Sequence, residues 1–557
     1  MPRKLSLPLG STNFKKVSTE CYYVDKTLLI KDFLDETGQI VLFTRPRRFG
    51  KTLNMDMLRT FFEKTDADTS KYFADKLIWQ QGEEYKKEQG QYPVIFLSLK
   101  DIKASSWSNA FALLKMVIGE EYGRHSELQG SIAVSERDAA IYESIVQNTA
   151  ADSAYFFSLK TLSHMLHAHY GKAPIIIIDE YDTPIQEGFI NGYYNEAVEF
   201  IRNFFSSAFK DNPHMSRGIL TGILRVAKES IFSGLNNIRV YSVMDRKFNR
   251  YFGFTTEEVQ TMAEYYDATD KMPEIKAWYD GYKFGNAEIY NPWSVLYYFD
   301  NDCIAMPYWV QTSANTIIRE MLQNLNVAAC ENLRALLNGT PVESVIETNT
   351  IYPRLREPQT NVLGFLLMTG YLKATETMVN EDGEYVCKLE LPNREIRTVY
   401  RKEIINLLTE NLGEDIVYTL RQALLHKDSQ KLKKSLQKFL LESVSYYDGL
   451  KENYYHGLLL GMSVIFDAAY YPLSNRESGA GRYDIELLPK DASMPGIIIE
   501  IKAVEHADDE KLAELAQRAL EQIENKQYDT EMLAKGIANV YKYGIAFCGK
   551  QVEVVSN

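Results

Sequence analysis

The architecture of this chain follows from one segment, Val41-Leu42-Phe43-Thr44-Arg45-Pro46-Arg47-Arg48-Phe49-Gly50-Lys51-Thr52. An apolar run, a basic turn and a Gly-Lys-Thr sequence predict a strand, a phosphate-binding loop and a helix over 53–63. In such a loop Lys51 contacts the β- and γ-phosphates and Thr52 ligates Mg²⁺, while the helix dipole favours the phosphate charge. Arg45 replaces the usual first glycine, which leaves the geometry of the loop open.

The loop needs an acidic partner for the magnesium ion, and residues 174–182 provide one. The run 175–178 is continuously apolar, as expected for a central strand covered on both faces. Asp179 and Glu180 then fall at the carboxyl edge, where open α/β sheets bind ligands. We expect Asp179 to hold Mg²⁺ through water and Glu180 to polarise the attacking water. Asp182 is either a supporting residue of the site or a helix cap.

Other short β-branched runs complete the predicted sheet, at 94–99, 218–221 and 239–243. With helical patterns between them, they predict a parallel α/β sheet with helices on both faces. At the end of the second of these runs, Thr221 is a candidate sensor of the γ-phosphate. Arg225 either neutralises transition-state charge or pairs with a structural carboxylate.

Three domains are predicted along the 557 residues, because one hydrophobic core cannot serve a chain of this length. Residues 1–245 form the α/β core. Residues 246–430 are mostly helical, with a hairpin near 384–398, and act as a lid or linker. Residues 431–557 form a second α/β domain. Its predicted elements are strands near 482–488 and 496–503, a helix near 508–526 and a hairpin near 543–555.

Composition places the chain among ordinary globular proteins, with 45% hydrophobic and 25% charged residues. The apolar stretches are too short to cross a bilayer and the N-terminus has no signal-peptide h-region, so no membrane partner is expected. Five cysteines without a CxxC pair argue against disulfides and thiolate zinc sites and favour the cytoplasm. The net charge of −13 counts against tight nonspecific nucleic-acid binding by the whole chain, although a local basic groove stays open.

A set of short segments resembles a family common in bacterial genomes, the AAA-ATPase-like proteins fused to a C-terminal PD-(D/E)XK nuclease-like domain. The resemblance covers nearly the whole chain. Its segments are Tyr23–Thr27, Thr44–Thr52, Ile178–Asp182, Thr221–Arg225, Ser233–Asn237, Trp278–Tyr282, Asn291–Ser294 and Thr369–Leu372. Arginine in place of glycine at position 45 is typical of that family.

The resemblance implies a P-loop ATPase core of the additional-strand type, followed by a helical or winged lid. ATP and Mg²⁺ are the implied ligands, and Arg48, Phe49 and Gly50 join Lys51 in the loop that contacts the nucleotide. Tyr23 is also implied to lie near the nucleotide, and the alternative is a helix cap with Tyr23 packed in the core. A homo-oligomer is one option for the assembly.

In the nuclease superfamily an aspartate and a Glu-x-Lys lie on neighbouring strands, and Asp484 and Glu500-Ile501-Lys502 match that pattern. Residues two apart on a strand share a face, so Glu500 and Lys502 project together while the isoleucines pack inward. Two carboxylates would hold a divalent cation, Mg²⁺ or Mn²⁺, that polarises the scissile phosphate and activates water, and the lysine would stabilise charge. The other interpretation is an ion-paired structural triad.

The resemblance adds Glu452 as a further metal ligand, with His456 on the same helical face, and places Glu477 and Gln522 near the site. Residues 431–557 hold 15 Lys and Arg against 19 Asp and Glu, so no basic stripe marks a nucleic-acid path. Two functions therefore stay open. Either an ATPase controls an active nuclease on DNA or RNA, or a signalling-type ATPase switch uses an inactive nuclease-like domain for recognition.

Overall fold

The fold was analysed in a computed structural model of the 557-residue chain. The structure describes residues 4–226, 231, 237–311, 332–333, 335–337, 339–347, 352, 362–400, 402–403, 414–443, 466, 469–474, 477–478, 481–482 and 484–557. The chain forms two compact units. The first combines Met1–Gln311 with Glu343–Glu395, and the second combines Thr312–Val342 with Ile396–Asn557. The predicted domain boundaries at 245 and 430 stay predictions.

The first unit is built around a parallel sheet. Its strands are β1 (Ile40–Thr44), β2 (Val94–Ser98), β3 (Ile175–Asp179), β4 (Arg217–Gly222) and β5 (Ile238–Tyr241). Its helices up to residue 209 are α1 (Phe14–Glu20), α2 (Leu28–Leu34), α3 (Lys51–Phe62), α4 (Glu83–Lys86), α5 (Trp107–Arg124), α6 (Glu136–Val146), α7 (Asp152–Phe156), α8 (Ser158–Tyr170), α9 (Thr183–Asn191) and α10 (Tyr194–Phe209).

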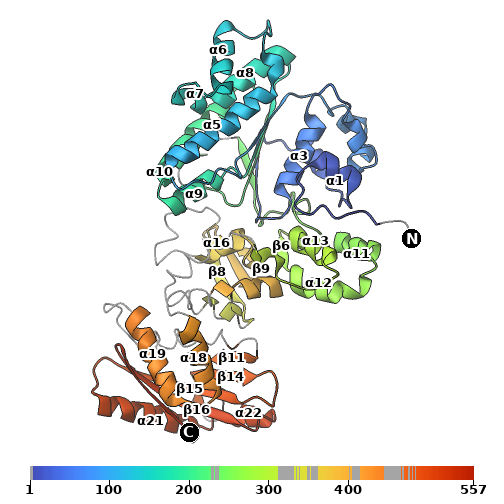
Figure 1. The fold of residues 1–557 in the computed structure, drawn as a ribbon. Helices are drawn as coiled ribbons and strands as arrows, with labels where there is room; N and C mark the ends of the chain where they lie inside the picture. The colour runs from blue at the N-terminus through green and yellow to red at the C-terminus, as the bar shows by residue number, and fades with distance from the viewer. Residues whose placement is uncertain are drawn as a thin grey trace. The chain divides into compact units, whose positions relative to one another are not determined.

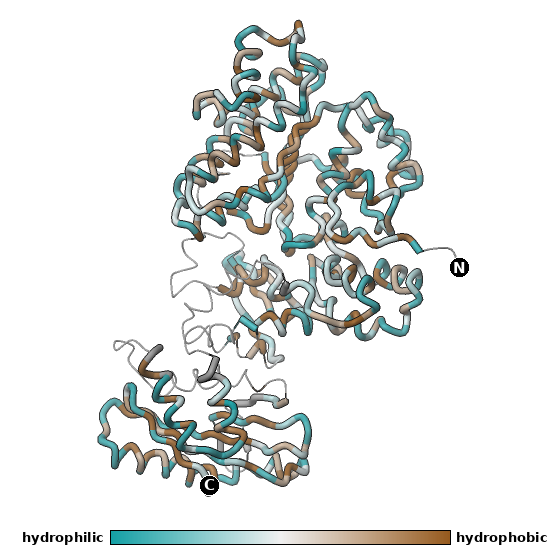
Figure 2. Tube along the Cα trace, in the orientation of Figure 1, coloured by the Kyte–Doolittle hydropathy of each residue, from teal (hydrophilic) through white to brown (hydrophobic). Residues whose placement is uncertain are grey.

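The strand order β2-β3-β4-β1-β5 confirms the predicted parallel α/β sheet. Strand β4 lies between the strand that precedes the phosphate loop, β1, and the strand that ends in the acidic pair, β3. Strands β1 and β3 are buried along their whole length, and the central strands are correspondingly hydrophobic in Figure 2. Figure 1 shows α5, α8 and α10 on one side of the sheet and α1 and α3 on the other, which buries both faces.

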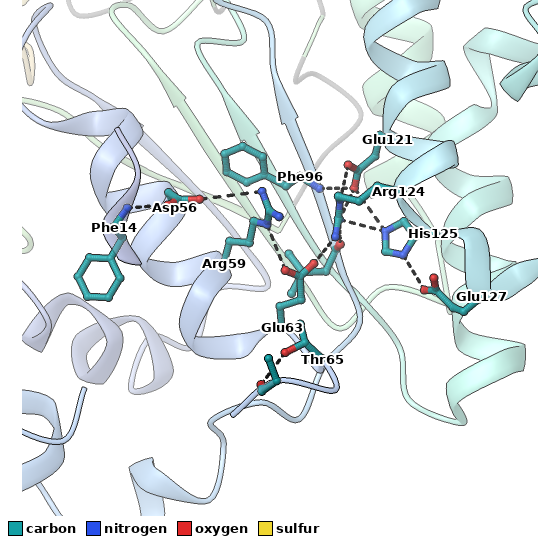
Figure 3. Close-up of polar contacts among 12 residues, drawn as sticks. Phe14, Asp56, Arg59, Glu63, Thr65, Phe96, Glu121, Arg124, His125 and Glu127 are labelled. Atoms are coloured by element: carbon teal, nitrogen blue, oxygen red, sulfur yellow. Dashed lines mark hydrogen bonds and ion pairs between the residues drawn. The ribbon is translucent and has the colours of Figure 1, made fainter. Parts of the chain in front are cut away.

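Charged side chains from α5 cover strand β2, which forms one edge of the sheet (Figure 3). The Phe96 N–H of the edge strand β2 donates to Glu121 Oε1 over 2.7 Å, and Arg124 donates to the carbonyl of Val94. Arg124 also pairs with Glu121 and with Glu63 at the end of α3. These bonds satisfy backbone groups that an uncovered edge strand would offer to another chain.

After β5 the chain continues in the first unit with a mainly helical segment and two small sheets, of order β6-β7 and β8-β10-β9. The elements are α11 (Thr256–Tyr265), α12 (Met272–Tyr279), β6 (Tyr282–Phe284), β7 (Ala287–Ile289), α13 (Pro292–Asp300), η5 (Tyr308–Gln311), β8 (Val342–Ile346), α16 (Val362–Met368), β9 (Lys373–Val379) and β10 (Tyr385–Glu390). The helices share their own apolar core with Tyr279, Tyr290 and Tyr298.

The hairpin predicted near 384–398 lies earlier in the chain, because β9 and β10 pair across a turn at 380–384. Gly383 has a φ of +79° in that turn, a conformation that glycine adopts without strain. Only the second strand, β10, falls inside the predicted range. Residues 394–400 are helical, so the prediction placed a strand where a helix begins.

The second unit contains a mixed sheet of order β11-β14-β15-β16-β17, in which only the β15–β16 pair is parallel. Helix α21 connects those two strands, as parallel neighbours require. The elements are α18 (Glu414–Leu425), α19 (Ser429–Ser443), β11 (Tyr470–Ser474), β12 (Glu477–Ser478), β13 (Gly481–Arg482), β14 (Ile485–Pro489), β15 (Gly496–Val504), α21 (Asp509–Asn525), α22 (Thr530–Ala534), β16 (Val540–Cys548) and β17 (Gln551–Ser556). The predicted strands, helix and C-terminal hairpin are confirmed.

Candidate functional site

Three residues from three elements meet at the carboxyl edge of the first sheet. Thr52 Oγ1, at the start of α3, donates to Asp179 Oδ2 over 2.7 Å, and Thr221 Oγ1, near the end of β4, donates to Asp179 Oδ1 over 2.5 Å. Asp179 and Thr221 are fully buried. Burial and the neighbouring Glu180 raise the pKa of Asp179. The loop hydroxyl and the strand-end carboxylate, which the sequence predicts to share a magnesium ion, are therefore in direct contact.

Lys51 lies inside the loop that precedes α3. Its Nζ donates to the carbonyl oxygens of Arg45, at 3.1 Å, and Pro46, at 3.0 Å, and only 4% of the residue is exposed. Burial lowers the pKa of Lys51, and the carboxylates of Glu180 and Asp179 oppose that shift. The lysine is thus held where oxygen acceptors surround it, which is the environment that phosphate oxygens would supply.

Glu180 and Asp182, which follow Asp179, make different contacts. Glu180 has a φ of +52°, its N–H donates to Thr221 Oγ1 over 3.2 Å, and its Oε2 accepts from Thr183 at 3.4 Å. Asp182 accepts hydrogen bonds from the N–H groups of Ile223 and Leu224 at 2.8 and 3.1 Å. Burial raises the pKa of Asp182 to about 6. Asp182 therefore supports the turn after β4 and gives no side-chain cap to α9.

Arg45 fills the place of the missing first glycine with a buried guanidinium group. It donates to the carbonyl oxygens of Thr44 and Tyr241 at 2.8 and 2.7 Å and lies over the rings of Phe252 and Phe284. Burial lowers the pKa of Arg45 to about 9. The side chain therefore connects the start of the loop to the end of β5 and to aromatic rings that follow it in the chain.

The other side chains that were predicted to contact the nucleotide, those of Arg48, Phe49 and Tyr23, contact protein groups in this structure. The Arg48 guanidinium carbon lies 3.5 Å from the centroid of the Trp293 ring, and Phe49 packs edge-on against Tyr282. Tyr23 packs against Phe14 and hydrogen-bonds to Met57 Sδ, which agrees with the alternative of a core residue. Nucleotide contacts by Arg48, Phe49 and Tyr23 stay predictions.

Arg225 follows the strand end that supplies Thr221. It is half-buried, and its Nε is buried without a hydrogen-bond partner. The alternative of a pair with a structural carboxylate stays open, because residues 227–230, next to it in the chain, lie outside the described residues. Its role beside a phosphate stays a prediction.

A second polar cluster lies on the sheet of the second unit. Lys502 Nζ donates to Glu500 Oε1 over 3.0 Å, and Asp484 Oδ2 accepts from the N–H of Ile501 at 2.7 Å. Gln522 of α21 donates both to Glu500 Oε1 and, over 3.2 Å, to the hydroxyl of Tyr528. The structure brings the predicted aspartate, glutamate, lysine and glutamine together.

Glu500 has the environment of a cation ligand. It is 2% exposed, and burial, together with Asp484, raises its pKa to about 7. Its Oε2 is buried without a hydrogen-bond partner, a costly position that a divalent cation would relieve. In the part of the chain that the structure describes, no group of three or more His, Cys, Asp or Glu residues could hold a metal ion. A cation here would rely on two carboxylates, with water or phosphate oxygens.

Two predicted members of this site cannot be placed. Glu452 lies outside the described residues, as do His456, which was predicted to share its helical face, and the side chain of Glu477. Sequence reasoning missed Tyr528 and Trp293. Tyr528 lies six positions after Gln522, close enough for a local pattern to have suggested it. Trp293 lies far along the chain from Arg48, and no sequence pattern links the two.

Comparisons with known proteins find two separate matches, one in the part of the chain with the first site and one in the part with the second. Residues 8–232 match the family model described as predicted AAA-ATPase, and residues 450–557 match that of the PD-(D/E)XK nuclease superfamily. The chain is 26% identical over 416 residues to an uncharacterized protein in the vnfD 5′ region of Azotobacter chroococcum mcd 1, covering 73% of this chain and 70% of that protein. No described helix is long and apolar enough to cross a membrane. The chain thus unites an AAA-ATPase-like segment with a segment of the PD-(D/E)XK nuclease superfamily, as its motifs predicted.

Proposed function

We propose that the first unit binds and hydrolyses ATP, and that its nucleotide state controls a metal-dependent nuclease in the second unit. The observation that carries the proposal is the contact of Thr52 and Thr221 with Asp179 beside the loop of Lys51. A hydroxyl and a carboxylate in contact at the end of a phosphate loop are the pair with which P-loop enzymes hold Mg²⁺.

Each residue of the first site has a role in the proposed reaction. Lys51 exchanges the carbonyl oxygens of Arg45 and Pro46 for phosphate oxygens. Thr52 and Asp179 hold Mg²⁺, which neutralises charge on the phosphates when it is bound. Glu180 orients the attacking water, and the Thr221 hydroxyl group holds the Asp179 carboxylate and the backbone N–H of Glu180. The Arg225 side chain adds positive charge at the same edge of the sheet.

The second site has the donor set for phosphodiester hydrolysis. Asp484 and Glu500 would hold Mg²⁺ or Mn²⁺, an ion that polarises the phosphate and lowers the pKa of bound water. Lys502 stabilises developing negative charge, and Gln522 keeps the Glu500 carboxylate in place with Tyr528 behind it. The substrate in this proposal is DNA or RNA, and the site of action is the cytoplasm.

A signalling-type switch is the second candidate function. The excess of acidic over basic residues in 431–557 favours it, because nucleic-acid binding normally needs a basic surface. In that case the first unit still binds ATP, and the second unit recognises a partner without cutting it.

The test is a cleavage assay of the full chain on plasmid DNA, single-stranded DNA and RNA, with Mg²⁺ or Mn²⁺ and with or without ATP. We expect the wild type to cut at least one substrate at an ATP-dependent rate. Lys51→Ala should lose ATP binding and the ATP response. Glu500→Gln should lose cleavage and keep ATP hydrolysis, while the exposed control Glu505→Gln keeps both.

The outcomes separate the two sites. Cleavage by Glu500→Gln at the wild-type rate would refute the assignment of the nuclease site. Unchanged ATP affinity in Lys51→Ala would refute the nucleotide site. A wild type that binds ATP and never cuts any substrate would favour the switch.

A further inference from the structure

The Arg48 side chain of the phosphate loop is the first member of a continuous chain of contacts. Its guanidinium group stacks on Trp293 with 3.5 Å between the guanidinium carbon and the ring centroid. Trp293 lies in the first turn of α13, which Asn291 caps by accepting from the N–H groups of Trp293 and Ser294. The loop is therefore in contact with the N-terminal end of α13.

The next residue of that helix continues the chain. Ser294 Oγ lies 2.9 and 2.8 Å from the two carboxyl oxygens of Glu395, and the backbone N–H of Trp309 donates to Glu395 Oε1 over 2.8 Å. Ser294 and Glu395 are fully buried and Trp309 is 6% exposed. A buried carboxylate thus joins three segments that are distant in the sequence.

These contacts end where the chain leaves the first unit. The segments of that unit finish at Gln311, two residues after Trp309, and at Glu395 itself. The two segments that lead from the first unit into the second, which end at Gln311 and Glu395, are therefore both contacted by the Glu395 carboxyl group or contain it. A shift of Ser294 changes the support of both segments at once.

If the loop binds a nucleotide, the Trp293 ring and the phosphate oxygens compete for the Arg48 guanidinium group. Its stacked position leaves Nη1 buried without a hydrogen-bond partner. A phosphate would offer charge-assisted hydrogen bonds, which are stronger than a half-buried contact with an aromatic ring. The guanidinium group can therefore exchange the Trp293 ring for phosphate oxygens.

We propose that Trp293, Ser294 and Glu395 form a relay through which the nucleotide bound at the loop loosens the two segments that leave the first unit. The inference rests on the proposed ATP binding. It specifies how the effect of bound nucleotide would be passed to the segments that lead into the second unit. Trp293 and Glu395 act as positioning residues, because neither touches the reacting atoms. The stacked position of Arg48 is one of the two states that such coupling needs, and a position on the phosphate would be the other.

The test is amide hydrogen exchange of the full chain with and without Mg²⁺ and a non-hydrolysable ATP analogue. We expect exchange in the segment 304–311, which contains the Trp309 amide, to rise on the order of two- to thirtyfold when the analogue binds. Trp293→Leu should bind the analogue and lose this rise. Trp79→Leu is the matched control, because Trp79 contacts Lys86 away from the loop, and it should keep the rise.

Ser294→Ala provides a second, smaller change that removes only the hydroxyl group, and it should also lose most of the rise. Bound analogue without a rise in the wild type, or a full rise in Trp293→Leu or Ser294→Ala, would overturn the relay. Failure of the wild type to bind the analogue in calorimetry would overturn the proposed function, and the relay with it. If Trp293→Leu does not fold, the wild type and Ser294→Ala decide the question.

Discussion

The hydroxyl group of Thr221 contacts both residues of the acidic pair, the carboxylate of Asp179 and the backbone of Glu180. It donates to Asp179 Oδ1, and it accepts from the backbone N–H of Glu180, so a single side chain orients the Asp179 carboxylate and holds the backbone of Glu180. Partners of this kind, which hold a metal ligand without touching the metal, contribute to catalysis through orientation. The residue thus belongs to the site even if it never contacts the γ-phosphate.

Thr221→Val keeps the shape of the side chain and removes that hydroxyl group. We expect the turnover number of ATP hydrolysis to fall roughly 10- to 100-fold, as for other partners of metal ligands, with nucleotide affinity little changed. Thr261→Val in the exposed face of α11 is the control and should leave turnover unchanged. Steady-state kinetics and calorimetry measure the two quantities, and wild-type turnover in Thr221→Val would contradict this role.

Glu395 provides a prediction about pH. Burial raises its pKa from 4.5 to about 7, so between these values the folded protein holds a proton that the unfolded chain releases. The free energy of unfolding of the first unit should therefore fall by a few kcal/mol as the pH rises from about 4.5 to 7. Glu395→Gln keeps the hydrogen-bond acceptor and should remove this slope.

All five tryptophans lie in the first unit, so tryptophan fluorescence during urea unfolding follows that unit alone. The exposed Glu381→Gln variant is the control and should keep the wild-type slope. A Glu395→Gln variant with the same pH dependence as the wild type would show that Glu395 does not titrate in this range.

At the scale of elements, the edge of the first sheet depends on α5. Glu121 is 6% exposed and bonds both to the edge strand β2 and to Arg124, which in turn pairs with Glu63, the residue that follows α3 (Figure 3). The network ties the helix of the phosphate loop to the edge strand. The network contributes to stability because it keeps the buried acid Glu121 paired, and a buried charge without a partner is costly in free energy.

Arg124→Ala removes the shared cation of this network. We expect a loss of about 3–5 kcal/mol in the free energy of unfolding, because Glu121 would keep a buried charge with less compensation. Amide exchange of Phe96 should accelerate as its acceptor becomes mobile. The control Lys31→Ala breaks an exposed pair with Asp35 and should cost at most about 1 kcal/mol. Equal losses in the two variants would rule out a special role for the network.

At the scale of the whole molecule, the second unit has a core of its own. Ile485, Ile497 and Ile499 pack on one face of its sheet with the helices α18 and α19. Gly544 of β16 lies on the face covered by α21, and a Cβ atom there would come within 2.1 Å of the Ala516 carbonyl oxygen. That approach involves backbone, which cannot move without displacing the helix.

Gly544→Ala should therefore destabilise the second unit by about 1–3 kcal/mol or more and leave the first unit intact. Circular dichroism should show an earlier loss of structure in urea, while tryptophan fluorescence and nucleotide affinity stay at wild-type values. Gly123→Ala is the matched control, because a Cβ there meets nothing within 4 Å. An equal shift of the fluorescence transition in Gly544→Ala would contradict independent unfolding.

The sequence by itself determined the elements whose residues are neighbours along the chain. The continuous apolar runs of β1 and β3 read as buried strands, and the acids and the Gly-Lys-Thr sequence that follow them fall at one edge because parallel strands end together. Alternation along β15 placed Glu500 and Lys502 on one face. The fold class follows from these local rules, whereas Gln522 and the other additions to the second site were implied by the family resemblance.

Only the tertiary structure decided which distant residues meet. The stacking of Arg48 on Trp293, the cover of β2 by Glu121 and Arg124, and the junction of Ser294 and Trp309 at Glu395 leave no periodic trace in the sequence. The burial of apolar surface is not directional, so an apolar pattern tells which face of a helix or strand is buried but not which residue it meets. Hydrogen bonds and ring contacts are directional, and they join particular residues only after those faces have packed. The hairpin at β9–β10 was misplaced for the same reason, because its strands are weakly apolar and their register depends on the pairing itself.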